Sequence, residues 1–286
     1  MGPRNLAGQF ALKDATGFVA GLAALVRPCL SSAGEVLVAG IGSVVTRPDR
    51  RGQGLSSQLQ RAVLERLAER GAALAVLWTD RPEIYAGRGF GPAGWEYHLD
   101  LGGLRVAESW PADADVVALG GGDAERLAGL YAQHPLRTLR QPEDHASLYG
   151  MPGTRAVGLE RGGRLVAYAC CGKGEDFPDY VAEWGGAPEP ALALLAHVAR
   201  CGLAGRALVP AGREDLLELA TARGAGFAAV PSGLWAVLRP DLLAQLAGPV
   251  PADHEREPGA WLGRLAADGT PHPGCLQVSI WGLDSV

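Results

Sequence analysis

The stretch VVTRPDRRGQGLSSQLQRAV, residues 44–63, constrains this chain more than any other part of its sequence. A β-branched run passes a proline, three arginines and two glycines, and then shows the four-residue apolar spacing of a helix at Leu55, Leu59, Val63 and Leu67. Glycine has more backbone freedom to lose than other residues, so we expect the exposed backbone to be used. In a strand–loop–helix junction the loop amides and the first helical amides converge, and the helix dipole favours negative charge there. The stretch therefore predicts a cradle for a pyrophosphate group.

Side chains of the same loop support this interpretation. Gly52 and Gly54 keep the approach to the backbone open, and Arg47, Arg50 and Arg51 can reach peripheral phosphate oxygens. The loop is neither a P-loop nor a dinucleotide fingerprint, because it contains neither GxxxxGK[ST] nor GxGxxG. A turn that is merely rich in glycine is the alternative.

The remaining composition excludes several classes of protein. A chain of 286 residues favours two domains, and it has no run of 18 apolar residues and no signal-peptide core, so we expect no membrane partner. Five cysteines without CxxC spacing argue against a disulfide framework or a zinc site and fit a reducing cytoplasm. The six histidines have no metal-ligand spacing, and we therefore expect no metal site.

Charge is distributed unevenly along the chain. Residues 1–103 carry a net +2 and residues 104–286 a net −7. No basic face typical of a nucleic-acid-binding protein is present, so we expect no nucleic-acid partner. A locally basic loop beside an acidic half favours an anionic cofactor and a cationic substrate.

Hydrophobic periodicity predicts an α/β protein with two units of similar element order. The first unit is expected to hold strands at 17–30 and 35–46, a helix from Leu55 to near Gly71, a strand at 72–79, a helix that starts at Asp80–Glu83, and a strand at 94–101. Residues 111–122 are interpreted as a link between the units. The second unit is expected to hold helices at 123–133, 191–201 and 214–224 and strands at 155–160, 163–171, 180–184, 207–210 and 234–238. A C-terminal tail with a helix at 259–265 and a closing strand is too short for a core of its own.

Two motifs carry a resemblance to a known family. The segment VVTRPDRRGQGLS resembles the acetyl-CoA motif of the GCN5-related N-acetyltransferases (GNAT), [QR]-x-x-G-x-[GA], with Ser56 in place of the final Gly or Ala. About 30 residues later, IYAGRGFGPAG resembles the Y-x-x-x-G-F motif of the family's last core helix, with Tyr85, Gly89 and Phe90. The resemblance is more specific still to the tandem-GNAT type of the enhanced-intracellular-survival (Eis) acetyltransferases, over about residues 15–240.

This resemblance implies two GNAT-like α/β units in tandem. Residues 1–103 would be an acetyl-CoA-binding GNAT domain, residues 104–240 a diverged GNAT-like pseudo-domain, and residues 241–286 a tail packing on the other units. The first unit is expected to lack its N-terminal elements, because the family's first strand and two helices have no room before residue 10. The sterol-carrier-like domain of Eis is also missing, so its aminoglycoside specificity is not carried over. The second unit has WGGAPEPALAL at the equivalent junction, without arginine and with Pro188 and Pro190 removing amide donors.

The resemblance also implies a reaction and its residues. The chain would transfer an acetyl group from acetyl-CoA, as co-substrate, directly to the amine of a small molecule, with a cationic molecule as the favoured acceptor. Tyr85 would be the general acid, because a phenol stays protonated at pH 7; an ordinary packed tyrosine is the alternative. The remaining expected contacts to acetyl-CoA are the strand residues Val44, Val45 and Thr46, the Arg51 side chain, and the amides of Gly52, Gln53, Gly54, Leu55, Ser56 and Ser57.

The sequence leaves three questions open. Asp80 and Glu83 are candidate bases, but their spacing is also that of a capping box. The resemblance to the Eis type implies the terminal carboxylate, here that of Val286, as a third candidate. A non-catalytic acetyl-CoA-binding sensor or assembly subunit is the alternative function. The oligomeric state is undecided, and a homo-oligomer is among the states that the sequence allows.

Overall fold

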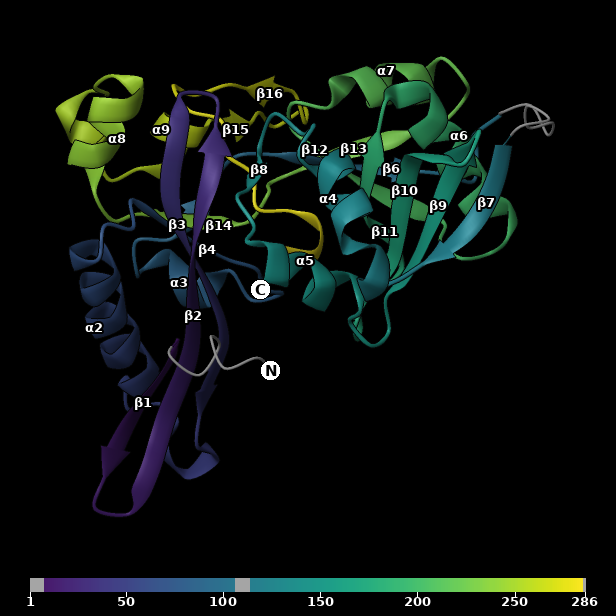
Figure 1. Cartoon of the computed structure of the whole chain (residues 1–286). Helices are drawn as coiled ribbons and strands as arrows, with labels where there is room; N and C mark the ends of the chain where they lie inside the picture. The colour runs from purple at the N-terminus through teal and green to yellow at the C-terminus, as the bar shows by residue number, and fades with distance from the viewer. Residues whose placement is uncertain (1–7, 106–113, 285–286) are drawn as a thin grey trace.

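The computed structural model describes residues 8–105 and 114–284 and confirms the α/β class (Figure 1). Two seven-stranded sheets lie side by side, each with helices packed on it. The first sheet contains β1 (Gln9–Asp14), β2 (Gly17–Ser31), β3 (Gly34–Thr46), β4 (Leu74–Leu77), β14 (Leu234–Val237) and β5 (Gly91–Pro92), with β8 (Arg137–Thr138) beside β2. The second sheet has the order β13 (Phe227–Val230), β6 (Glu96–Asp100), β12 (Arg206–Pro210), β11 (Asp176–Gly186), β10 (Arg164–Lys173), β9 (Arg155–Arg161) and β7 (Ala114–Leu119).

Helices cover both faces of each sheet. In the first sheet, α2 (Leu55–Glu69) and α3 (Glu83–Ala86) share one core with β2 and β3, while α8 (Pro240–Ala247) and α9 (Pro258–Leu262) pack on the opposite face. In the second sheet, α6 (Pro188–Arg200) and α7 (Glu214–Thr221) cover one face, and α4 (Ala124–Tyr131) and α5 (Pro142–Tyr149) cover the other.

The expected hairpin of the first unit is confirmed. The strands β2 and β3 pair antiparallel from Ala20↔Thr46 to Ser31↔Gly34. The continuously apolar run that follows α2 forms β4, which is buried at every residue and pairs with β3 on one edge and β14 on the other. Such a strand has no solvent-facing side, which explains why it lacks polar residues.

Each sheet contains strands from the other half of the chain, and besides the short β8 there is one such strand in each sheet. The strand β6, which the sequence order assigns to the first unit, pairs with β12 and β13 in the second sheet. Conversely, β14 lies in the first sheet between β4 and β5, although the sequence order assigns it to the second unit. The division at residues 103 and 240 stays a prediction, and both large sheets contain strands from either side of residue 103.

Two further expectations about single elements are corrected. The supposed link contains β7, which pairs with β9 over its whole length, while residues 111–113 lie outside the described residues. The closing strand is absent from the described part of the tail, where residues 275–281 are irregular and a 3₁₀ turn (Gly282–Asp284) follows. The tail nevertheless fills space in the cores, with Leu276, Val278 and Ile280 in that of the first sheet and Trp281 in that of the second.

A buried ionic cluster fixes the end of this tail. The Arg140 guanidinium pairs with the carboxylates of Glu183 on β11 and Asp284, and the three side chains are 0, 0 and 3% exposed. The guanidinium lies 3.7 Å from the Tyr131 ring centroid, and Tyr131 donates a hydrogen bond of 2.9 Å to Asp284. The amide of Leu283 also donates to Glu183 at 3.1 Å. One cation thus compensates two buried carboxylates from distant parts of the chain.

We expect Arg140→Met to lower the free energy of unfolding by about 3–5 kcal/mol, because it leaves two carboxylates buried without their cation. Urea unfolding followed by tryptophan fluorescence measures this difference. The matched control is Arg126→Met, which removes the ion pairs of a more exposed arginine with Glu160 and Asp123 and should cost about 0–1 kcal/mol. Equal losses in the two variants would contradict the role given to the cluster.

Candidate active site

The site is built where two parallel strands separate. The strands β3 and β4 pair only at Val38↔Leu74, Ala39↔Ala75 and Gly40↔Val76. Beyond Gly40, β3 continues to Thr46 without a partner strand on that edge in the described structure, while its other edge stays paired with β2. An unpaired strand edge presents N–H and C=O groups to whatever enters the opening. This opening contains the predicted residues Val44, Val45 and Thr46.

A β-bulge lies within the same stretch of β3. Gly21 of β2 faces Val45 and Ala23 faces Gly42, so β3 has one more residue than β2 between these pairs. Ser43 has a φ of 52°, a left-handed conformation that is uncommon and costly for a residue with a side chain. A bulge re-aims the neighbouring backbone and bends the strand. The backbone of β3 is therefore deformed at the point where it parts from β4.

The glycine loop has the geometry of the predicted cradle. Gly52 and Gly54 adopt φ values of 76° and 72°, and a Cβ at either position would meet no atom within 4 Å. Left-handed backbone, not crowding, therefore requires glycine here. No side chain caps α2, whose first hydrogen bond runs from the Gln58 amide to the Gly54 carbonyl at 3.0 Å. The backbone N–H groups of residues 52–57 have no acceptor in the part of the chain that the structure describes.

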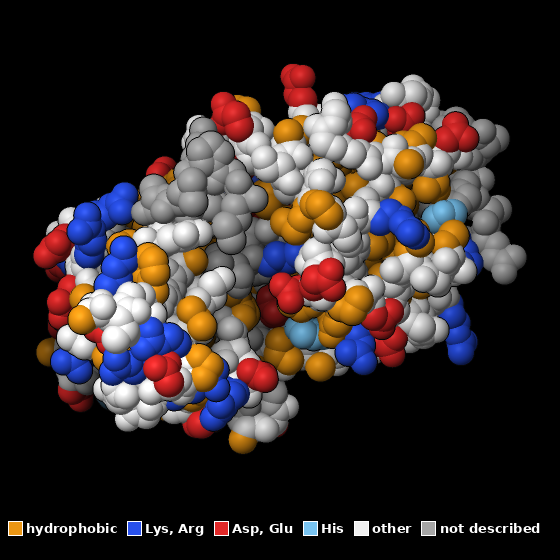
Figure 2. Space-filling view, turned by 90° about the horizontal axis from the view of Figure 1, so that it is seen from below, with side chains coloured by type: hydrophobic (Ala, Val, Ile, Leu, Met, Phe, Trp, Pro, Cys, Tyr) orange, Lys and Arg blue, Asp and Glu red, His pale blue; other side chains and the backbone are white. Residues whose placement is uncertain are grey.

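Only one of the three loop arginines is free of an ion pair within the described residues. Arg47 pairs with Asp49 at 2.7 Å, and Arg50 pairs with Asp14 of β1 at 2.7 Å. The second of these pairs fastens the loop to the β1–β2 hairpin. Arg51 is exposed and makes one long hydrogen bond, 3.4 Å, to the Thr46 carbonyl. Figure 2, seen from the end that carries this loop, shows Lys and Arg side chains gathered on the first unit.

Tyr85 lies on α3, on the same face of the sheet as α2. Its ring packs edge-on against Phe90, with centroids 6.1 Å apart, in the core that also contains Leu59 and Val63. The Tyr85 hydroxyl forms no hydrogen bond within the described structure. It is not fully enclosed by protein atoms, so solvent reaches it. Burial raises the pKa of this phenol and the charge of Arg88 lowers it. The ring is fixed and the proton is available to a ligand.

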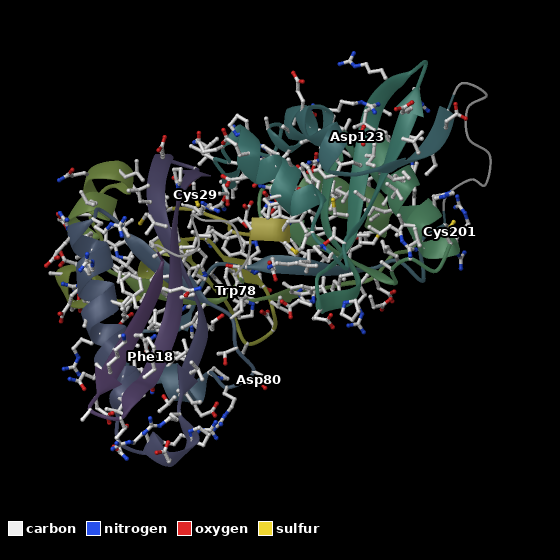
Figure 3. All side chains as sticks on the ribbon, turned by 60° about the horizontal axis from the view of Figure 1, so that its bottom comes forward. Phe18, Cys29, Trp78, Asp80, Asp123 and Cys201 are labelled. Carbon is white, nitrogen blue, oxygen red and sulfur yellow. The ribbon has the colours of Figure 1, made fainter. Side chains whose placement is uncertain are left out.

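The candidate bases are not brought together with Tyr85 by any described contact. No side-chain bond caps α3, so the expected capping box of Asp80 and Glu83 is wrong; Glu83 instead pairs with Arg81 at 3.2 Å. Asp80 is exposed on the loop after β4 (Figure 3). Val286 lies outside the described residues. The base therefore stays unassigned.

Sequence reasoning missed two residues next to Tyr85. Gln60 is 1% exposed on the buried side of α2, and its Oε1 accepts a hydrogen bond of 3.1 Å from Nη1 of Arg88. The Arg88 guanidinium carbon lies 5.4 Å from the Tyr85 ring centroid. A glutamine beside the apolar stripe of α2 was the available signal, because buried polar groups require a partner.

The second sheet has a corresponding opening that side chains fill. The strands β11 and β12 pair in parallel only at Tyr180↔Arg206 and Val181↔Ala207. Beyond these pairs the Trp184 indole donates to the Leu208 carbonyl at 2.8 Å, and the guanidinium of Arg213 lies 4.4 Å from the Trp184 ring centroid. Buried His134 and Trp281 pack against the same indole. At the following helix α6, Pro188 occupies the first turn with Glu189, a residue that repels anions.

Two classes of site find no support in the described residues. No group of three or more His, Cys, Asp or Glu residues there could hold a metal ion. No helix in residues 8–105 and 114–284 is long and apolar enough to cross a membrane.

Comparisons with known proteins agree with this geometry. Residues 13–93 match the family model described as "Acetyltransferase (GNAT) domain". No curated protein matches the chain.

Solved structures with a similar fold include three acyltransferase-like proteins. A GCN5-related N-acetyltransferase from Kribbella flavida has a TM-score of 0.63 and 21% identity over 85% of this chain and 63% of its own. A probable N-acyltransferase of Enterococcus faecalis V583 gives 0.62 and 15% over 82 and 63%. Eis1 of Mycobacterium abscessus gives 0.55 and 16% over 85 and 66%. The chain thus spans less than two thirds of the length of the first two proteins, and at these identities the likeness concerns the fold.

The separated strands, the glycine cradle and the tyrosine helix all lie within residues 13–93, which the GNAT model matches. Residues 13–93 therefore form a GNAT domain, and over 85% of its length the chain has a fold similar to that of GNAT proteins of known structure.

Proposed function

We propose that this chain transfers an acetyl group from acetyl-CoA to the amine of a small molecule, a cationic one in particular. The match of residues 13–93 to a GNAT domain supports acyl transfer as the general class of reaction. The observation that carries the finer proposal is the open backbone around one opening: the free edge of β3 continues into the unsatisfied amides of residues 52–57. Edge amides suit an amide-containing pantetheine arm, and helix-terminal amides suit a pyrophosphate.

The residues of the chain would divide the chemistry as follows. Amides of Gly52 to Ser57 and the Arg51 side chain would hold the pyrophosphate. An N–H group of the β3 edge among Val44, Val45 and Thr46 would polarise the thioester carbonyl, as in an oxyanion hole. Tyr85 would give its proton to the sulfur that leaves when the amine attacks the carbonyl carbon. The acidic balance of residues 104–286, a net −7, supports a cationic acceptor.

The filled opening of the second sheet supports a single active site per chain. Its side chains already use backbone acceptors there: the Trp184 indole donates to the Leu208 carbonyl and Arg213 to the Gly186 carbonyl. Its helix offers fewer amides because of Pro188 and Pro190. We infer that the second unit shapes and supports the site without binding acetyl-CoA itself.

We expect the full chain to bind one acetyl-CoA, and Gly54→Pro to weaken that binding by about 10- to 100-fold. Proline removes one amide and cannot adopt the φ of 72°, and a lost charge-assisted hydrogen bond is worth about 1.5–3 kcal/mol. Isothermal titration calorimetry gives both affinity and stoichiometry. The matched control is Gln53→Ala, which removes the side chain but keeps the backbone N–H of residue 53, so this variant should bind acetyl-CoA normally. Full affinity for acetyl-CoA in a natively folded Gly54→Pro variant would show that the loop is a turn without a binding role.

We expect Tyr85→Phe to lower kcat about 100-fold with little change in the KM for acetyl-CoA. The ring packing against Phe90 is kept, and only the proton offered to the sulfur is lost, an interaction that matters mainly in the transition state. The assay follows free thiol released from acetyl-CoA across a panel of mono- and polyamines. A wild-type rate in the Phe variant would return Tyr85 to a packing role. Tight acetyl-CoA binding without turnover of any amine would instead favour a sensor.

A further inference from the structure

Arg88 and Gln60 form a pair behind the tyrosine that the proposed reaction does not yet use. Gln60 is a fully buried polar residue on a helix whose other buried positions are Leu59, Val63 and Leu67. Its Oε1 accepts from Arg88, while its Nε2 has no partner in the described structure. Burying a polar side chain costs free energy, so its position calls for a task that a leucine would not perform.

The task is visible in the placement of Arg88. This half-buried arginine forms no ion pair with any described carboxylate, and it lies two residues after the end of α3. Its guanidinium carbon is 5.4 Å from the Tyr85 ring centroid, within the range of a cation–π contact. A neutral glutamine thus holds an uncompensated positive charge against the face of one phenol. A carboxylate in place of Gln60 would hold the arginine equally well but would neutralise its charge.

The other charged groups nearby do not duplicate this role. Arg88 and Gln60 line a groove of about 850 Å³ between α2 and α3. Its remaining charged side chains are Arg61, Glu65 and Glu69 of α2, Glu83 of α3 and Arg256 of the tail. Arg88 is the one whose charge lowers the pKa of Tyr85, against the opposing effect of burial.

We propose that Arg88, held by Gln60, is a positioning residue that stabilises the negative charge arising on Tyr85 when its proton passes to the leaving sulfur. This inference rests on the proposed function. In the step, the acceptor nitrogen forms the C–N bond, the C–S bond breaks, and the Tyr85 proton goes to the sulfur. Water takes up the proton that the acceptor nitrogen loses, and the phenolate of Tyr85 regains a proton from water. The guanidinium lies over the ring whose oxygen is anionic in between.

A double-mutant cycle tests this pairing. We expect Arg88→Met to lower kcat about tenfold with an unchanged KM for acetyl-CoA, and to have no further effect in a Tyr85→Phe background. Gln60→Leu, which removes the acceptor of the Arg88 hydrogen bond, should act in the same direction but less. Arg61→Met is the matched control, because this arginine lines the same groove from the other helix and should leave kcat unchanged.

A spectroscopic titration gives a readout that a purely structural role would not move. The tyrosinate absorbance of each protein minus that of its Tyr85→Phe partner isolates the ionisation of Tyr85. Arg88→Met should shift this titration to higher pH by about one unit, since removal of the cation leaves the effect of burial unopposed.

Three results would overturn the inference: an unmoved titration, an Arg88→Met defect that persists in full without the Tyr85 hydroxyl, or a defect confined to the KM for acetyl-CoA. The last would make Arg88 a phosphate contact. Absence of turnover by the wild-type protein would refute the proposed function separately, and the titration would still decide whether Arg88 acts on Tyr85.

Discussion

The separation of β3 from β4 after Gly40 is the constraint on which the rest of the site depends. Backbone N–H and C=O groups in a fold require partners, so a strand that leaves its neighbour for six residues loses stability unless something else satisfies it. Here the loss is concentrated where the chain also places a bulge at Ser43 and the uncapped start of α2. Each feature is locally unfavourable, and together they form one continuous surface of unsatisfied backbone. That surface suits the proposed ligand, which is rich in amide and phosphate groups.

The second sheet shows that the same divergence does not by itself make a site. Where β11 leaves β12, Trp184 bridges the strands, and Arg213 donates to the Gly186 carbonyl at 3.1 Å. Buried His134 accepts from Arg213 while its Nε2–H donates to the Trp184 carbonyl, because burial lowers the pKa of this histidine to about 3 and keeps it neutral. Large aromatic side chains and a tail residue thus fill this opening. The difference between an open and a filled opening lies in side-chain volume and internal partners, not in strand topology.

Much of this could be predicted from the sequence, where the signal was local. The hairpin, the glycine cradle and the Tyr85–Phe90 pair follow from turn residues, periodicity and short spacing. The exchange of β6 and β14 could not be predicted, because strand pairing between distant segments leaves no trace in either segment alone. The pairing of Arg50 with Asp14 escaped for the same reason, and it reduces the free cations expected at the phosphates. The capping box failed because α3 has only four residues and Pro82 at its N-cap.

The exchanged strand also explains why the second unit is needed by a site that it does not contain. Of the two strands that border the opening, β3 is held by its long hairpin with β2, but β4 has only four residues. On the edge away from β3, β14 pairs with β4 along the whole length of β4. The Trp78 indole, just after β4, donates to the Ser232 carbonyl at 2.9 Å, just before β14 begins. The second half of the chain therefore sets the position of β4 and of α3 after it. Since Tyr85 stands on α3, the distance between its phenol group and the β3 edge is fixed by packing that reaches into both sheets.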